Sequence, residues 1–338
     1  MKSTLIALAG LVAIAAPAQA QTVAEFYKGK NLTLLIGFPP GGGYDANARV
    51  LARHMGRYMP GEPGITPSNM PGAGSIVAAN HTFNQAAADG TVFTIFAPSA
   101  AMEAILGNKA ARFDPVKFSW IGSMAQEVAY CGVWQGPGIA RNWDEVMSQE
   151  TIFGGGAPAA VTFQHPMVLK NVLGAKMRVV SGYPGTRDVN LAMNRGEVHG
   201  SCGLYGSSIN SQWLKEVQSG QLKLVVQMGP KKTDMFGPIP SVFDLAKTEE
   251  DRQILDVHFG QQLLSRPFAA PPNIPADRLA ALRDAFAKTM QDKEFLADAQ
   301  KIGLDIDPIT GPEIEAALKR FAAFPESVLK KAEAAMGR

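Results

Sequence analysis

The residues best suited to chemistry in this chain are glycines at the junction of a strand and a helix. The stretch Phe38–Asp45 reads Phe-Pro-Pro-Gly-Gly-Gly-Tyr-Asp and joins an apolar run, Leu32–Ile36, to a helical pattern that begins near Ala46. Glycines let the backbone approach a bound molecule closely, and the free N–H groups of a helix N-terminus attract an anion. The stretch predicts half of a carboxylate cradle. Taken alone, it is equally compatible with a tight turn that holds no ligand.

Two further glycine turns show the same pattern of an extended segment, a turn and a helix start. Met70–Ser75 leads from an extended segment into a helix over residues 76–86, and Ser75 is placed to cap that helix. Gly154–Pro158 follows the strand Thr151–Phe153 and precedes a helix near residues 159–172, with its proline in the first helical turn. We expect this last turn to form the other half of the cradle.

Two polar side chains next to these turns have two possible roles each. Asp45 is placed to cap the first turn of its helix, and ligand contact is its second possible role. Thr186, after the turn Gly182–Gly185, either caps the following helix or offers its hydroxyl group to a ligand.

The motifs of several enzyme classes are missing from the sequence. No phosphate-binding loop, dinucleotide fingerprint, Gly-x-Ser-x-Gly elbow or His-Glu-x-x-His pair occurs. The five histidines are scattered singly, so we expect no metal site and no cofactor. A catalytic group assembled in space is not excluded by sequence distance. An enzyme that acts on a carboxylate in the periplasm therefore remains the alternative to a non-enzymatic role.

Composition and the first residues predict export. Residues 1–20 contain one lysine, a short apolar core and the ending Ala-Gln-Ala, which is typical of a cleaved signal peptide. We expect cleavage after Ala20 and a periplasmic location. The formal net charge of +2 without a lysine or arginine run argues against a nucleic-acid partner. Cys131 and Cys202 either form a disulfide or remain free buried thiols, because spacing alone does not bring their Cα atoms together.

The remaining pattern predicts repeated strand–helix units and two domains. Expected strands are residues 92–96, 118–124, 128–134, 177–181, 198–204, 221–228 and a strand near 259–264; residues 98–99 are expected to begin a loop. Expected helices toward the C-terminus are residues 275–290, 292–302, 311–322 and 325–336. In parallel units of this kind, a ligand lies at the carboxyl ends of the strands.

In their order, these motifs resemble a known family. The turns Pro39–Asp45, Asn69–Ser75 and Gly182–Thr186, with Asp89-Gly90-Thr91 and Gly196-Glu197-Val198, are similar to the periplasmic solute receptors of tripartite tricarboxylate transporters, the Bug family. The resemblance covers essentially the whole chain after residue 20. It implies an α/β, two-lobed, periplasmic-binding-protein-like fold of type II (Venus flytrap), in which each lobe has a central, mostly parallel sheet flanked by helices.

The resemblance also implies a boundary for each lobe and a set of ligand contacts. Residues 21–124 and 236–338 would form the first lobe, and residues 125–235 the second. The implied contacts are Phe38, Gly42, Gly43, Asp45, Ala73, Gly74 and Ser99 from the first lobe, and Gly156, Ala157, Tyr183, Gly185, Thr186 and Gly203 from the second. Phe38, Tyr44, Tyr183 and Tyr205 could wall an aliphatic or aromatic spacer between two carboxylates.

The function implied by the resemblance is reception of a solute. A monomeric protein would bind a small carboxylate, either a di- or tricarboxylate or an aromatic acid, between its lobes and deliver it to the membrane permease subunits of a transporter. A sensory binding protein that docks on a membrane sensor is a further alternative.

Overall fold

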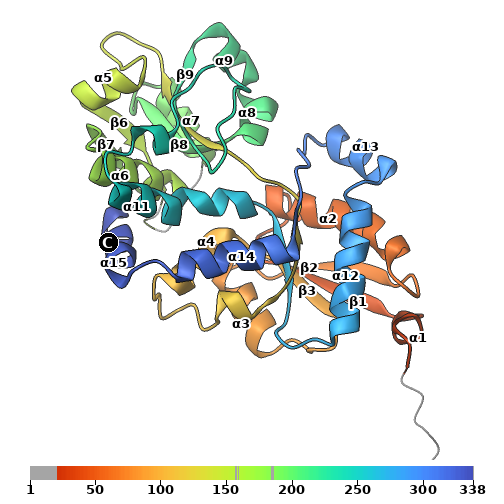
Figure 1. Cartoon of the computed structure of the whole chain (residues 1–338). Helices are drawn as coiled ribbons and strands as arrows, with labels where there is room; N and C mark the ends of the chain where they lie inside the picture. Colours follow the sequence, from red (N-terminus) through yellow and green to blue (C-terminus); the bar gives the residue numbers. More distant parts are fainter. Residues whose placement is uncertain (1–20, 157, 159, 184–185, 338) are drawn as a thin grey trace, which may run out of the picture.

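Two α/β lobes, each built around its own sheet, make up the protein (Figure 1). The structure is a computed structural model and describes residues 21–156, 158, 160–183 and 186–337. The predicted signal peptide, residues 1–20, lies outside the described residues. Among the described helices, none is both long enough and apolar enough to span a membrane.

The first sheet has six strands in the order β11-β4-β10-β3-β1-β2. β1 pairs in parallel with β2 and β3, whereas β10 runs antiparallel between β3 and β4. The strands are β1 Asn31–Ile36, β2 Gly64–Asn69, β3 Val92–Ile95, β4 Ser119–Ser123, β10 Pro267–Ala270 and β11 Ile309–Thr310. Because β1, β2 and β3 are parallel, the loops that follow them emerge at the same edge of the sheet.

The second sheet repeats this plan with five strands in the order β7-β6-β8-β5-β9. β6 pairs in parallel with β7 and β8, and β5 runs antiparallel between β8 and β9. The strands are β5 Ala129–Trp134, β6 Thr151–Gly154, β7 Met177–Val180, β8 Gly200–Tyr205 and β9 Leu222–Met228. The predicted two-lobed α/β fold is confirmed. Each sheet is mixed because the strand that enters it from the other lobe, β10 or β5, is antiparallel to its neighbours, and in the first sheet β11 is antiparallel to β4 as well.

Helices cover both sheets and connect the lobes. They are α1 Val23–Tyr27, α2 Gly43–Met55, α3 Ile76–Asn84, α4 Pro98–Ile105, α5 Trp143–Ser148, α6 Val161–Leu173, α7 Thr186–Asn194, α8 Gly206–Gln212, α9 Leu214–Ser219, α10 Val242–Leu245, α11 Glu249–Phe259, α12 Ala276–Thr289, α13 Lys293–Lys301, α14 Gly311–Ala322 and α15 Glu326–Ala335. Short 3-10 turns occupy Gly56–Tyr58, Ala73–Ser75, Pro115–Lys117 and Gly260–Leu264.

The chain passes between the lobes more than once. β4 leads into β5, and the segment after α11 leads into β10; these two crossings run side by side, with hydrogen bonds from the Glu127 N–H to the Gln262 carbonyl group (3.1 Å) and from the Met124 N–H to the Arg266 carbonyl group (3.1 Å). α14 packs on β4 of the first lobe, whereas α15 packs on α6 and α11 beside the second sheet (Figure 1). The lobe boundaries at residues 124 and 236 stay a prediction.

Several expected elements need correction. Residues 259–264 are not a strand: they end α11 and form a 3-10 turn, because Phe259, Leu263 and Leu264 are spaced for helical turns rather than for alternation. The strand lies later, at β10. Residues 98–99 open α4 instead of a loop, since proline suits a first helical position. α6 begins at Val161, so Pro158 precedes it, and Pro166 lies inside it.

The two cysteines form a disulfide between adjacent strands. Cys131 of β5 and Cys202 of β8 are register partners, and their Cα atoms lie 4.0 Å apart. Both side chains are fully buried. The disulfide therefore joins the strand that enters the second lobe to a strand at the centre of its sheet.

Candidate functional site

The first glycine turn is exposed and opens α2. α2 begins at Gly43, with Gly42 as its N-cap residue, and Gly41 adopts a φ of +86°. A Cβ atom added to Gly42 would meet no atom within 4 Å. The space beside Gly42 is therefore open at the N-terminus of a 13-residue helix, where the helix dipole favours an anion.

Asp45 holds this turn in shape. Because α2 starts earlier than predicted, Asp45 is the third residue of the helix and does not cap it. Its buried carboxylate accepts hydrogen bonds from the Gly41 N–H, the Arg49 Nε and the Asn69 Nδ2, each at 2.9 Å. The hydrogen bond from Arg49 and those from Gly41 and Asn69 lower the pKa of Asp45 to about 2. Asn69 also donates to the Phe38 carbonyl group, so the carboxylate ties the turn to the end of β2.

The second turn carries unusual backbone angles. Ala73 and Ser75 have φ values of 46° and 75°, and Gly74 between them has a φ of 61°. Left-handed backbone at residues other than glycine costs free energy and collects at binding sites. The expected cap is wrong: the Ser75 hydroxyl group does not cap α3 but accepts the Ala97 N–H at 2.9 Å, which ties this turn to the end of β3. Ser99 lies in the first turn of α4, which follows β3.

Four of the predicted contacts in the second lobe lie near the start of α6 or of α7. The Gly156 N–H donates to the Thr162 hydroxyl group (3.0 Å), and the Tyr183 N–H donates to the Gly155 carbonyl group (3.3 Å). Gly203 has a φ of +78°, and a Cβ there would lie 3.0 Å from Val161. Thr186 opens α7. Ala157 and Gly185 lie outside the described residues.

A cavity of about 220 Å³ separates the first glycine turn from the second lobe. It is lined by Gly41–Gly43, Ala46 and Asn47 of the first turn and α2, by Ala125, Glu127 and Arg266 of the crossings, by Ser208 and Gln212 of α8, and by Ile302–Asp305 after α13. Gly42 and Gly43 are the predicted contacts that line it; among the described residues, the other predicted contacts do not. A second cavity, of about 350 Å³, lies alongside it and shares Glu127 and Asp305.

The cavity wall contains a buried ion pair. The Nη2 of Arg266 lies 3.1 Å from the Oε2 of Glu127, with the two side chains 13% and 6% exposed. The Arg266 guanidinium group also lies 4.6 Å from the ring centroid of Tyr44, and that ring stacks on Phe38 at 4.1 Å. Burial raises the pKa of the Tyr44 and Tyr205 phenols, so both stay protonated at neutral pH. Of the four aromatic residues expected to wall a spacer, Tyr44 thus contacts both the Arg266 guanidinium group and the ring of Phe38.

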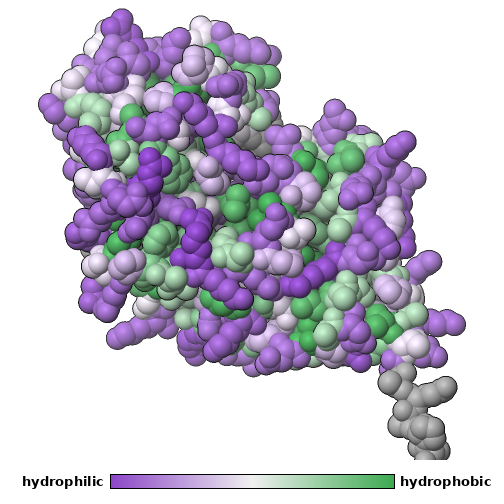
Figure 2. Space-filling view, in the orientation of Figure 1, coloured by the Kyte–Doolittle hydropathy of each residue, from purple (hydrophilic) through white to green (hydrophobic). Residues whose placement is uncertain are grey.

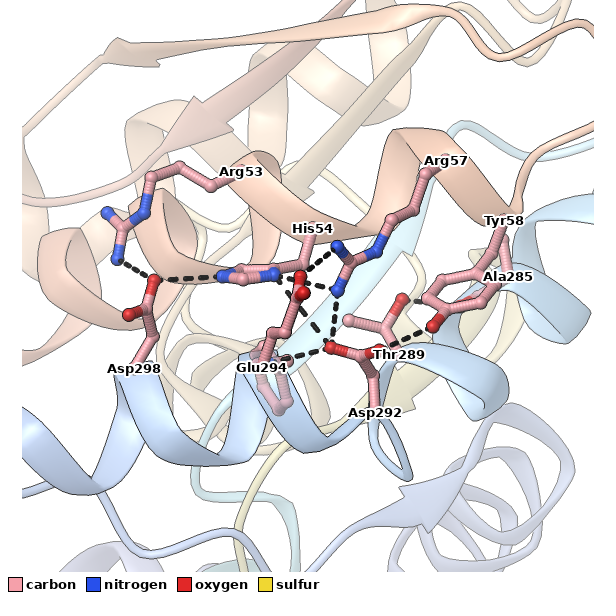
Figure 3. Close-up of polar contacts among 10 residues, drawn as sticks. Arg53, His54, Arg57, Tyr58, Ala285, Thr289, Asp292, Glu294 and Asp298 are labelled. Carbon is pink, nitrogen blue, oxygen red and sulfur yellow. Dashed lines mark hydrogen bonds and ion pairs between the residues drawn. The ribbon is translucent and has the colours of Figure 1, made fainter.

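A second charged cluster joins α2 to α13 (Figure 3). His54, Asp292 and Glu294 have ligand atoms close enough together for a metal ion. The Arg57 guanidinium group lies among them, however, and contacts Asp292, Glu294 (2.5 Å) and the Nδ1 of His54 (3.1 Å). The positive charge of this cluster is thus supplied by an arginine. The cluster fixes α13 on α2, and both helices lead to residues that line the cavity.

The surface agrees with a site between the lobes. In the space-filling view, polar residues cover much of this face, and apolar residues form several patches, one of which lies in the middle of the view (Figure 2). Ile302 at the cavity and Met235 at the neighbouring cavity are exposed apolar side chains, at 49% and 53%. Apolar surface at the mouth of a cleft is typical of a small-molecule site.

Comparison with known proteins agrees with this arrangement. No family model matches the chain. The sequence is 33% identical to Protein BugT of Bordetella pertussis over 98 residues, which are 29% of each chain. It is 25% identical over 335 residues to a Cupriavidus necator protein described as a UPF0065 protein in the gbd 5′ region, covering 97% of this chain and 92% of the other.

The fold is similar to that of a TctC solute-binding protein from Polaromonas, with a TM-score of 0.68, 16% identity, and coverage of 90% and 99% of the two chains. The predicted resemblance to the Bug family is confirmed. Two other proteins of similar fold were solved with ligands: MatC of Rhodopseudomonas palustris with malate (TM-score 0.61, 17% identity, 89% and 99% covered) and an R. palustris protein with adipate (TM-score 0.65, 16% identity, 90% and 98% covered). Because these proteins are only 16–17% identical to the chain, the structural similarity shows a shared fold and nothing about the ligand.

Most residues of the cavity wall were not predicted from the sequence. Ser208 and Gln212 belong to α8, and the stretch Tyr205-Gly206-Ser207-Ser208 repeats the strand, glycine and helix pattern that identified the other turns. Glu127 and Arg266 carry no such signal, because each lies in a crossing segment and their contact depends on how the two segments pair.

Proposed function

We propose that the protein is a periplasmic receptor that binds a small carboxylate between its lobes and passes it to the membrane subunits of a tripartite tricarboxylate-type transporter. The observation that carries the proposal is the position of Gly42 and Gly43, whose exposed turn opens α2 at a cavity between the lobes. The malate and adipate bound by proteins of the same fold support a carboxylate ligand. In this role the protein acts as a monomer and catalyses no reaction.

The thirteen predicted residues remain our proposed contact set in the ligand-bound protein. Gly42 and Gly43 would offer backbone N–H groups to one carboxylate. Gly156, Tyr183 and Gly203 come from loops that follow β6 and β7 and from β8 itself, so they would reach the ligand when the lobes close. This proposal predicts that most of the binding free energy comes from backbone donors, and that truncating single side chains weakens binding only modestly.

Thermal unfolding of the chain from Gln21 tests the proposal directly. Protein freed of co-purified ligand by unfolding and refolding would be heated with mono-, di- and tricarboxylates and aromatic acids. A ligand that binds the native state raises the unfolding midpoint by mass action. A rise with one class of carboxylate supports the receptor role and identifies the ligand class. No rise with any of them, or chemical conversion of the bound compound, would refute it.

A further inference from the structure

The cavity wall contains a charge that the predicted contact set does not use. Arg266 immediately precedes β10 and lies beside the first glycine turn: the position of a Cβ on Gly43 would be 3.6 Å from its Nη2. Its side chain is 13% exposed and lines the cavity. A buried guanidinium group always keeps its positive charge. An anion that enters this cavity therefore meets a full charge as well as backbone donors.

The contacts of Arg266 leave donors for a ligand. Its Nη1 donates to the Ser265 carbonyl group at 2.7 Å, and its Nη2 faces Glu127 at 3.1 Å. The Tyr44 ring centroid lies 4.6 Å from the guanidinium group, and the Tyr44 hydroxyl group accepts a further hydrogen bond from it. A guanidinium group has five N–H donors in a planar fork, and these contacts use only some of them.

Glu127 is placed to compensate this charge while the cavity holds no anion. Its side chain is 6% exposed and lines the same cavity. A buried ion pair is weak evidence for stability, because the desolvation of two charges offsets most of their attraction. An apolar pair would join the crossings as well. The position of both charges at the cavity wall therefore favours a role in binding.

We propose that Arg266 is the specificity-determining residue of this site: its guanidinium group binds a carboxylate of the ligand, and Glu127 is the resident counterion with which that carboxylate competes. The inference rests on the proposed function and adds to it a charge requirement. The ligand carries a negative charge at the end that faces the first glycine turn, and its uncharged amide is rejected. Glu127 lowers the affinity for this charge.

Two variants at the pair test the assignment, because the proposal gives them opposite effects. Arg266→Gln removes the charge that binds the carboxylate, so the dissociation constant is expected to rise at least tenfold. Glu127→Gln removes the competing charge and keeps the shape, so the dissociation constant is expected to fall several-fold. The probes are acetate, malate, adipate and citrate, measured by calorimetry, together with the monoamide of whichever acid binds most tightly.

A matched pair elsewhere in the first lobe serves as the control. Arg283 and Glu315 are ion-paired (2.5 Å) and half-buried, and neither lines the cavity. Arg283→Gln and Glu315→Gln are expected to leave all dissociation constants unchanged. If the Arg266 and Glu127 variants changed only the unfolding midpoint and, like the controls, left every dissociation constant unchanged, the pair would be a structural link and the proposal would be overturned.

The outcomes separate the two proposals. Binding of a probe to the wild-type protein, with equal constants in both pair variants, would refute the role of Arg266 and leave the receptor function standing. No binding of any probe to the wild-type protein would refute both. If Arg266→Gln did not fold, the sign of the change in Glu127→Gln would still decide, since a structural role does not predict tighter binding.

Discussion

The carboxylate of Asp45 is the most direct point at which to test how the first glycine turn is held. Replacement by asparagine keeps the size of the side chain but removes the charge that accepts from Gly41, Arg49 and Asn69. The amide nitrogen of the new side chain would also face two of these donors. We expect Asp45→Asn to loosen the turn, to lower the free energy of unfolding and to weaken ligand binding.

The expected loss of unfolding free energy in Asp45→Asn follows from the pKa of Asp45. A decrease from the ordinary value of 3.8 to about 2 corresponds to about 2 kcal/mol of stability at pH 7, since one pKa unit is about 1.4 kcal/mol. Arg49 is 42% exposed, so water screens part of this interaction. We therefore expect a loss of about 1 to 2 kcal/mol in the variant at pH 7.

The sign of the pH dependence is also fixed. Because the folded state lowers the pKa, the stabilisation is fully present above the unfolded-state value near 3.8 and is lost as the pH falls toward about 2. The difference between wild type and variant should thus be constant from pH 7 to about pH 5 and should shrink below pH 4. Urea unfolding at several pH values measures it.

An exposed pair of the same spacing is the control. Asp284 and Lys288 lie one turn apart on α12, at 2.7 Å, with both side chains more than half exposed. Asp284→Asn is expected to change the free energy of unfolding by less than about 0.5 kcal/mol. Equal losses in the two variants, or no loss in Asp45→Asn, would show that the carboxylate does not hold the turn.

Three other predictions concern binding, the disulfide and acid stability. Gly42→Val should keep the fold, because a Cβ there meets no neighbour, but should abolish carboxylate binding by filling the turn; normal calorimetric binding would refute the cradle. Replacing Cys131 and Cys202 by alanine should cost about 2 to 4 kcal/mol in urea unfolding, since the disulfide closes a long loop; an unchanged midpoint would contradict this. Burial lowers the pKa of His165 to about 3, so the native state resists the proton that the unfolded chain binds, and stability should fall from about pH 6.5 downward; His165→Asn should flatten this slope in acid unfolding curves.

Local signals were sufficient for the elements that create the site. An apolar run followed by a glycine turn and a helical pattern located β1 with α2 and β2 with α3, because a strand, a turn residue and a helix start each depend on neighbours in the chain. The capping box of Thr248 and Asp251 marked α11 in the same way. The expected strand at residues 259–264 is wrong because this region ends α11 and continues as a 3-10 turn, and the strand is β10.

Contacts between segments that are far apart in the chain could not be predicted from the sequence. The disulfide depends on the register of β5 and β8, which brings the Cα atoms of Cys131 and Cys202 within reach. Likewise, Arg266 meets Glu127 because the two crossings pair side by side. Spacing along the chain does not determine either arrangement, so the pair that lines the cavity was found only in three dimensions.

The position of α15 limits how the lobes can move. Two neighbouring crossings alone would act as a hinge and permit rotation about the line through them. α14 packs on β4 of the first sheet and α15 packs on α6 beside the second sheet, so residues 323–325 form a third connection between the two sides. Three extended residues span about 10 Å, which limits how far the two lobes can move apart. Glycines inserted between residues 323 and 325 should widen the range of molecular dimensions measured by small-angle scattering. An unchanged range would show that the two crossings alone limit the movement of the lobes.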